Sequence, residues 1–214
     1  MSAPIDLPLR CICGQVRGVI GAGSPRLRGI CYCRDCRAYA HHLGRAEVLL
    51  DAAGGSDITA TLPRGVHFHT GVDRLRCLRL AERGPLRWYT ACCHTPVGNT
   101  APDWRLPFVG IVHACLADGR EALDTVLGAP EVRVFAGSAL AALPERPVGV
   151  RVAARWHQLR FMAMVMGERL RGNHQHTPYF REDGQPLVAP HRLTEEAWHV
   201  AYDKAATQGG NAGE

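Results

Sequence analysis

The chain has 214 residues, a mass of 23.3 kDa and a formal net charge of +5 at pH 7. Its 46% hydrophobic and 21% charged residues are typical of a globular protein and exclude a disordered or fibrous chain. No segment approaches the roughly 18 apolar residues of a membrane span, and the N-terminus lacks the pattern of a secretory signal. We therefore expect a cytoplasmic protein without a membrane partner. Basic residues are not interleaved with aromatic ones, so no nucleic-acid partner is expected.

Short apolar runs bounded by Gly, Pro and Asp predict that the first two-thirds of the chain is rich in β-strands. The last two predicted strands before residue 91 flank a turn through Gly84-Pro85, which predicts a hairpin. A helix is predicted from about Asp35 to a C-capping Gly44, and a shorter one over 119–126. The predicted strands are Leu9–Cys13, Gln15–Ile20, Leu27–Tyr32, Ile58–Leu62, Val66–His69, Leu75–Leu80, Leu86–Thr90, Phe108–Cys115 and Val132–Phe135.

The proline-bearing stretch 143–147 predicts a boundary between a domain over 1–145 and a helical extension over 146–214. Beyond it, helical spacing of apolar residues predicts a long helix over 150–170, in which Met162, Met164 and Met166 are expected to pack in the core. A second, short helix is predicted to begin near Thr194. The residues from Gln208 onward are expected to be disordered.

The nine cysteines are the most informative feature of the sequence. In a reducing compartment, cysteines at short spacings indicate metal ligands rather than disulfides. Two of them, Cys77 and Cys115, stand alone and are expected to be small core residues. The clustered ones are Cys11 and Cys13, then Cys31, Cys33 and Cys36, then Cys92 and Cys93.

Zinc is the expected metal, since it prefers four tetrahedral ligands and is commonly held by thiolates. Cys11 and Cys13 are expected to alternate on a strand, so that both face one side, and Gly14 allows a sharp turn behind them. They supply two ligands, and Cys92 and Cys93 are the expected donors of the other two.

The second cluster offers three thiolates within six residues, an arrangement that resembles the three protein ligands of a catalytic zinc. A fourth side chain would instead close the site. The candidates for that ligand are His41, His42, Cys77, Cys115, His67 and His69.

The elements Cys-x-Cys-Gly at 11–14 and Cys-x-Cys-x-x-Cys-Arg at 31–37, followed by Thr95-Pro96, resemble the glutathione-dependent formaldehyde-activating enzyme family. That family also includes centromere-protein-V-like proteins, and the resemblance covers residues 9 to 115. It implies a mainly β (α+β) fold, a β-tent of packed antiparallel sheets. It also implies a structural zinc between the first and third elements, a three-cysteine zinc at the second, and carbon–sulfur lyase activity on glutathione–aldehyde adducts.

The sequence departs from the family pattern at three places. Tyr32 replaces a histidine, and Thr90 takes the position of the first cysteine of the third element. Cys92 is then the expected substitute ligand, with His94 or Cys77 as alternatives. Bulky residues over 38–42 stand where the family leaves room, so a glutathione pocket is not carried over. The segments 87–93 and 96–100 most resemble an uncharacterised bacterial branch of the family.

We therefore expect a zinc protein that handles a small-molecule thiol–carbonyl adduct at Cys31, Cys33 and Cys36, with His41 or His42 as general acid or base. The alternative is a non-catalytic zinc module that binds protein or nucleic acid. A redox or metal sensor is a third possibility. Neither the substrate nor the oligomeric state follows from the sequence.

Overall fold

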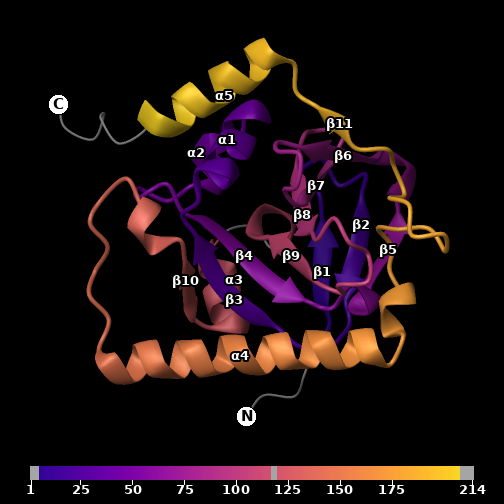
Figure 1. Cartoon of the computed structure of the whole chain (residues 1–214), viewed down its shortest axis with the longest axis horizontal. Coiled ribbons are helices and arrows are strands. Elements are labelled where there is room, and N and C mark those ends of the chain that lie inside the picture. Colours follow the sequence, from indigo (N-terminus) through magenta and orange to yellow (C-terminus); the bar gives the residue numbers. More distant parts are fainter. Residues whose placement is uncertain (1–4, 117–119, 208–214) are drawn as a thin grey trace.

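The computed structural model describes residues 5–116 and 120–207, in which the strands form two β-sheets (Figure 1). One is three-stranded, in the order β1-β2-β5, and the other eight-stranded, in the order β10-β3-β4-β9-β8-β7-β6-β11. Together with the helices this confirms the predicted α+β class. The strands are β1 (Leu7–Arg10), β2 (Arg17–Ile20), β3 (Leu27–Cys31), β4 (Ser56–Thr61), β5 (Val66–Thr70), β6 (Leu75–Arg79), β7 (Leu86–Thr90), β8 (Pro96–Thr100), β9 (Val109–Val112), β10 (Val132–Val134) and β11 (His191–Arg192).

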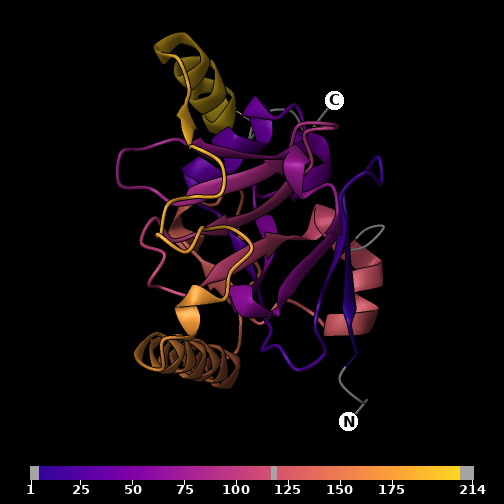
Figure 2. The same ribbon diagram turned by 90° about the vertical axis from the view of Figure 1, so that its right-hand side faces the viewer.

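Two helices lie at opposite edges of the molecule: α4 runs along one edge, and α5 packs on α1 at the other (Figures 1 and 2). The α-helices are α1 (Arg34–His42), α2 (Ala46–Leu49), α3 (Arg120–Leu127), α4 (Val148–Leu170) and α5 (Glu195–Thr207). Single 3-10 turns occur at Pro63–Gly65, Val72–Arg74, His113–Cys115, Ala136–Ser138 and Asn173–Gln175. No described helix is long and apolar enough to cross a membrane.

The main core lies between the two sheets and includes Trp88, whose side chain is fully buried. Residues of the C-terminal extension complete this core, since the rings of Tyr179 and Phe180 lie 5.3 and 6.4 Å from that of Trp88. The extension also adds β11 parallel to β6 at the sheet edge. The residues that follow the proline-bearing stretch therefore share a core with those that precede it.

The predicted hairpin is confirmed, with β6 and β7 antiparallel and Cys77 opposite Trp88. The helix predicted from Asp35 is also confirmed, and Gly44 beyond it has a left-handed φ of 65°. The long helix and the short one after Thr194 form as predicted, and the Thr194 hydroxyl accepts from the Ala197 amide at 3.2 Å. The first residue of the predicted 119–126 helix and the expected disorder from Gln208 lie outside the described residues.

Two predicted strands end well before the expected residue. The strand predicted over Leu9–Cys13 ends at Arg10, and the segment from Cys11 to Gly14 is a turn in which the Gly14 amide donates to the Cys11 carbonyl at 2.8 Å. Gly14 has φ of 76°, a conformation that favours glycine. The predicted Phe108–Cys115 strand is confined to β9 and continues as a 3-10 turn.

Candidate metal centres

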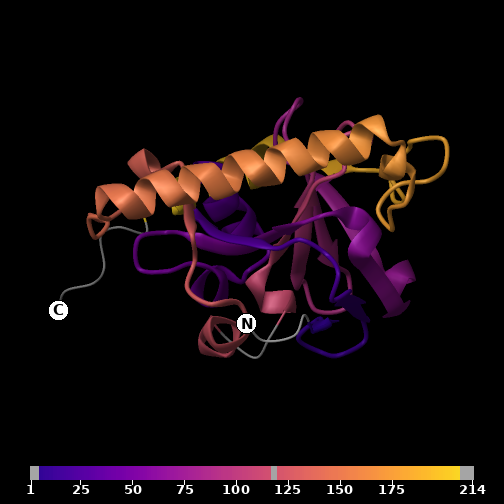
Figure 3. The ribbon, with the colours of Figure 1, turned by 90° about the horizontal axis from the view of Figure 1, so that it is seen from below.

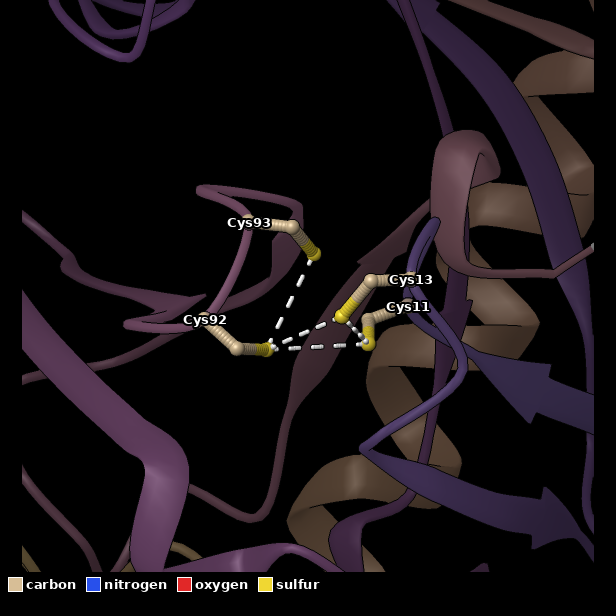
Figure 4. A group of neighbouring side chains, drawn as sticks. All are labelled: Cys11, Cys13, Cys92 and Cys93. Carbon is tan, nitrogen blue, oxygen red and sulfur yellow. Dashed lines mark hydrogen bonds between the residues drawn. The ribbon is translucent and has the colours of Figure 1, made fainter.

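Four cysteines from two separate turns converge at the first cluster, as Figure 4 shows. The turn between β1 and β2 supplies Cys11 and Cys13, and the turn between β7 and β8 supplies Cys92 and Cys93. The sulfur of Cys92 lies 3.9, 3.4 and 3.8 Å from those of Cys11, Cys13 and Cys93. Zinc–thiolate bonds of about 2.3 Å in a tetrahedron separate the sulfurs by about 3.8 Å. All four sulfurs lie within 4.8 Å of one another, so the cluster matches the size of such a site.

The β7–β8 turn explains how two adjacent cysteines reach one point. His94 adopts a left-handed φ of 53° and its amide donates to the Thr90 carbonyl at 2.9 Å. The buried Thr90 hydroxyl accepts from the Thr95 amide at 3.2 Å. Thr90 therefore organises the turn instead of serving as a ligand. His94 and Cys77, the alternative ligands, are not in the group, and Cys77 is buried in the core.

Hydrogen bonds around this cluster favour the thiolate form of one cysteine. The Thr90 and Thr95 hydroxyls lie 3.4 and 3.1 Å from the Cys93 sulfur. Burial raises the pKa of the Cys93 thiol, but hydrogen bonds from these hydroxyls and from Cys13 outweigh it and hold that pKa at about 5. Burial raises the pKa of Cys11, which nevertheless accepts from the Val16 amide at 3.3 Å. Arg45 holds the turn itself by donating to the Cys93 carbonyl at 2.7 Å.

The second cluster forms where β3 passes into α1. Cys31 ends the strand, Cys33 is the N-cap of the helix, and Cys36 lies in its first turn. The sulfurs of Cys31 and Cys36 are 3.7 Å apart, and all three lie within 4.8 Å of one another. The Cys33 sulfur accepts from the Cys36 amide at 3.3 Å. The start of a helix favours negative charge, so this position suits thiolate ligands.

A buried arginine that the sequence analysis did not single out contacts the second cluster. Arg87, on β7, is 2% exposed, and its Nη1 donates to the Cys36 sulfur at 3.7 Å. The same nitrogen donates to Asn99 Oδ1 at 3.2 Å, and the guanidinium lies over the Tyr39 ring. Hydrogen bonds from the other two thiols, and then the charge of Arg87, hold the pKa of Cys36 well below its usual value. An arginine inside an otherwise apolar strand is the sequence signal that could have identified it.

A second buried arginine ties the cluster's loop to the C-terminal helix. Arg37 is 4% exposed and donates to the carbonyls of Tyr32 and Ser138 at 2.6 and 2.8 Å. It also donates to the carbonyl of Ala205, on α5, at 2.9 Å. The loop that carries the second cluster is thus fixed by residues distant in sequence.

Among the described residues, no fourth histidine, cysteine or carboxylate joins the three sulfurs of the second cluster. The six side chains that the sequence offered as a fourth ligand all lie outside this group. Cys77 and Cys115 are buried in the main core, and His67 and His69 are exposed on the smaller sheet. His41 and His42 end α1.

The two histidines of α1 do not share the face of Cys36. A helix turns about 100° per residue, so residues three and four positions after Cys36 share its face, whereas His41 and His42 are five and six positions after it. Burial, together with the charges of His191 and His94, lowers the pKa of His42. The charged groups that act on His42 are therefore other histidines, and not the cysteines of the second cluster.

A cavity of about 870 Å³ borders the first cluster, and its wall includes no residue of the second. Its wall is mostly apolar and runs from β1 to α3. Residues that line it include Leu7, Cys11, Ile12, Val48, His113 and Leu123.

The fold and the two cysteine clusters define a mixed α+β protein with two groups of side chains able to hold a metal ion. Over residues 2–189 the chain matches a family of unknown function (DUF6151), and it belongs to that family. No curated protein matches the chain. The family description names no metal, reaction or partner. Membership of the family therefore identifies neither the metal nor the chemistry of this chain.

Proposed function

We propose that this is a zinc protein that binds a structural ion at the first cluster and a functional ion at the second, where it acts on thiol–carbonyl adducts. The observation that carries the proposal is the ligand count. The first group has four thiols, whereas the second has three and no fourth described ligand.

Zinc is the metal that suits the first cluster best. Four sulfur ligands at tetrahedral separations are typical of structural zinc, and such sites contribute directly to folding. The ion would join the β1–β2 turn to the β7–β8 turn and so connect the two sheets.

At the second cluster, zinc held by three thiolates supplies an exchangeable fourth position that favours a soft ligand such as a substrate thiolate. The chain's own residues prepare the site for negative charge. The Arg87 guanidinium faces Cys36 from inside the protein, and Cys33 caps the first turn of α1. Cys33 is the partly exposed member of the three, so a ligand would approach from its side.

The proposed reaction is cleavage or formation of a thiohemiacetal, and the resemblance to formaldehyde-activating enzymes supports this choice. In cleavage the carbon–sulfur bond breaks, its electron pair leaves with sulfur as thiolate, and the hydroxyl oxygen forms the carbonyl. The hydroxyl proton passes to solvent water. Because His41 and His42 lie off the face of Cys36, neither would contact the reacting atoms.

A specific observation also favours a second candidate, a non-catalytic zinc module. The Tyr202 hydroxyl on α5 donates to Asp35 Oδ1 at 2.7 Å. Asp35 lies between Cys33 and Cys36 in the sequence. An ion at the second cluster would then serve to anchor the C-terminal helix. Under this alternative the second ion stabilises the protein and no adduct is turned over.

Metal analysis and an adduct assay distinguish these possibilities. The purified wild-type protein should contain two zinc ions per chain. Cys33→Ser and Cys13→Ser should each contain about one zinc ion per chain. The control variant, Cys77→Ala, should still contain two. The thiol–aldehyde assay should lose turnover in Cys33→Ser and keep it in Cys77→Ala. Equal turnover in wild type and Cys33→Ser would exclude the lyase, and unchanged zinc in Cys33→Ser would exclude the second site.

A further inference from the structure

Helix α4 has two apolar faces, and only one of them is covered. The inner face packs on the edge of the sheet through Phe161 and Val165, which are buried together with Leu62. The ring of Phe161 lies 6.2 Å from that of Phe108. Glu168, the single acidic residue of α4, is also on this side and is paired with Arg64 at 2.7 Å. These contacts fix the orientation of the helix.

The opposite face, which we call the outward face, is exposed along the whole helix (Figure 3). Trp156 is 61%, Leu159 57% and Leu170 85% exposed. The expected core packing of Met162 and Met166 was therefore wrong, since each is 41% exposed. A helix that is apolar on both sides is normally covered on both sides. The outward face consists of Val148, Val152, Trp156, Leu159, Met162, Met166 and Leu170.

Arginines flank the outward face. Arg151 and Arg155 lie along one side of it, and Arg160 and Arg171 along the other, as the helical repeat of about 3.6 residues requires. All four are exposed. The face therefore combines a strip of apolar and aromatic side chains with positive charge at both margins.

An arginine-lined groove continues the positive charge from α4 to β10. This arginine groove is a cavity of about 500 Å³ whose wall includes Arg133, Arg146, Arg151 and Arg155, with Glu145 as its one acidic residue. Arg133 donates to the Pro144 carbonyl and Arg146 to the Glu131 carbonyl, both at 2.6 Å, so two guanidinium groups are held in place. Within the described part of the chain, no carboxylate lies within 4.0 Å of these four arginines.

We propose that the outward face and the arginine groove form a docking surface for a membrane that contains anionic phospholipid. Helices that lie in the plane of a membrane combine Trp, Leu and Met on one side with Arg or Lys beside them. The arginines would meet lipid phosphates while Trp156 and its neighbours enter the boundary of the acyl chains. The 23 residues of α4 present a surface about 35 Å long.

The shape of this surface also favours a membrane over a peptide. Peptide helices are usually bound in grooves, whereas α4 forms a ridge along the outer edge of the described structure (Figures 1 and 2). A ridge can contact a flat surface over its whole length. The expectation of no membrane partner considered only spanning segments, which a helix lying on the surface does not need.

A second copy of the chain is the other occupant to consider, and the charges disfavour it. If two α4 helices packed through their outward faces, the arginine margins of the copies would meet. Neither margin carries an acidic residue that could offset them, since Glu168 is on the inner face.

The test is co-sedimentation of the full, zinc-loaded chain with vesicles. We expect binding to an equimolar mixture of phosphatidylcholine and phosphatidylglycerol, none to phosphatidylcholine alone, and release by high salt. Trp156→Glu with Leu159→Glu should abolish binding, and Arg151→Glu with Arg155→Glu should weaken it at least about tenfold. Trp156→Phe should keep binding but lose the blue shift of tryptophan fluorescence that accompanies it.

Matched controls separate this surface from general effects. Val200→Glu replaces an exposed apolar residue of α5. Arg74→Glu with Arg83→Glu makes the same change in charge at exposed positions outside α4. Both controls should bind like wild type, and circular dichroism with zinc content should show every variant folded. Failure of the wild type to bind, equal binding to neutral vesicles, or equal loss in the controls would overturn the proposal. The proposal would also be overturned if the wild type did not bind vesicles but formed a dimer in light scattering, and if Trp156→Glu with Leu159→Glu converted that dimer to a monomer.

Discussion

Arg87 Nη1 lies 3.7 Å from the Cys36 sulfur, and both residues are buried. The contact links β7 to α1, which carries Cys36 of the second cluster. The turn that follows β7 carries Cys92 and Cys93 of the first cluster. A buried guanidinium needs a negative partner, and a buried thiolate needs a positive one. Among the described carboxylates, the only one that pairs with Arg87 is Asp35, at 4.0 Å. The positive charge of Arg87, on a strand of the larger sheet, therefore stabilises the thiolate form of Cys36 in the second cluster.

Replacement of Arg87 should weaken metal binding at the second cluster selectively. Arg87→Met removes the cation that faces Cys36 but keeps a long side chain in the core. We expect about one zinc per chain to be released much faster to a chromophoric chelator, while the first cluster releases its ion at the wild-type rate. Loss of the buried pair should also cost about 3 kcal/mol of unfolding free energy. Arg76→Met, an exposed change on the neighbouring strand, is the control, and equal chelator kinetics in Arg87→Met would contradict this coupling.

In metal-free protein, Cys93 should be the thiol that reacts at low pH. Its pKa of about 5 lies below the roughly 8.5 of an unfolded thiol. Its contribution to stability is therefore complete above the unfolded pKa and is lost as the pH falls through about 5. Alkylation at pH 6.5 followed by mass spectrometry should label Cys93 first, since the buried Cys36 is shielded from the reagent. Thr90→Val should slow this labelling by raising the pKa, and Thr70→Val, an exposed control, should not change it.

The sequence predicted those parts of both sites that depend on neighbours in the chain. The spacing of Cys31, Cys33 and Cys36 around a helix start is a local pattern, and so is the hairpin that precedes Cys92. The structure brings these residues together as the sequence analysis expected. For Cys31, Cys33 and Cys36 local spacing was sufficient, because strand and helix geometry determine where these side chains project.

Apart from the pairing of Cys11 and Cys13 with Cys92 and Cys93, contacts between distant segments could not be predicted in this way. Arg87 and Cys36 are 51 residues apart, and no periodicity relates them. The role of Thr90 depends on a turn that forms only when His94 adopts a left-handed conformation. The outward face of α4 has the apolar spacing of a core helix, and only its place at the edge of the structure shows that it is exposed.

The left-handed backbone of His94 should make this position favour glycine. A side chain with a Cβ at φ of 53° costs about 1 kcal/mol relative to glycine, and a β-branched one costs more. His94→Gly should therefore raise the midpoint of chemical denaturation in the metal-free protein, and His94→Val should lower it. His69→Gly and His69→Val, at an exposed position of β5, control for the change in residue type. A midpoint for His94→Gly below that of wild type would show that the imidazole contributes more than the backbone strain costs.

Removal of the Tyr202 hydroxyl should loosen α5 from the second cluster. The hydroxyl donates to Asp35 at 2.7 Å, and the Tyr202 ring stacks on Trp198 with centroids 4.1 Å apart. Tyr202→Phe keeps the stacking but leaves Asp35 without this donor, which should cost about 1 kcal/mol. Hydrogen exchange should then accelerate in α5 and in the first turn of α1, while the amides of β7 keep their protection. Tyr179→Phe is the matched control, since its buried hydroxyl has no hydrogen-bond partner among the described residues. If α5 exchanges at the wild-type rate in Tyr202→Phe, its attachment depends on the Arg37–Ala205 contact and the apolar packing instead.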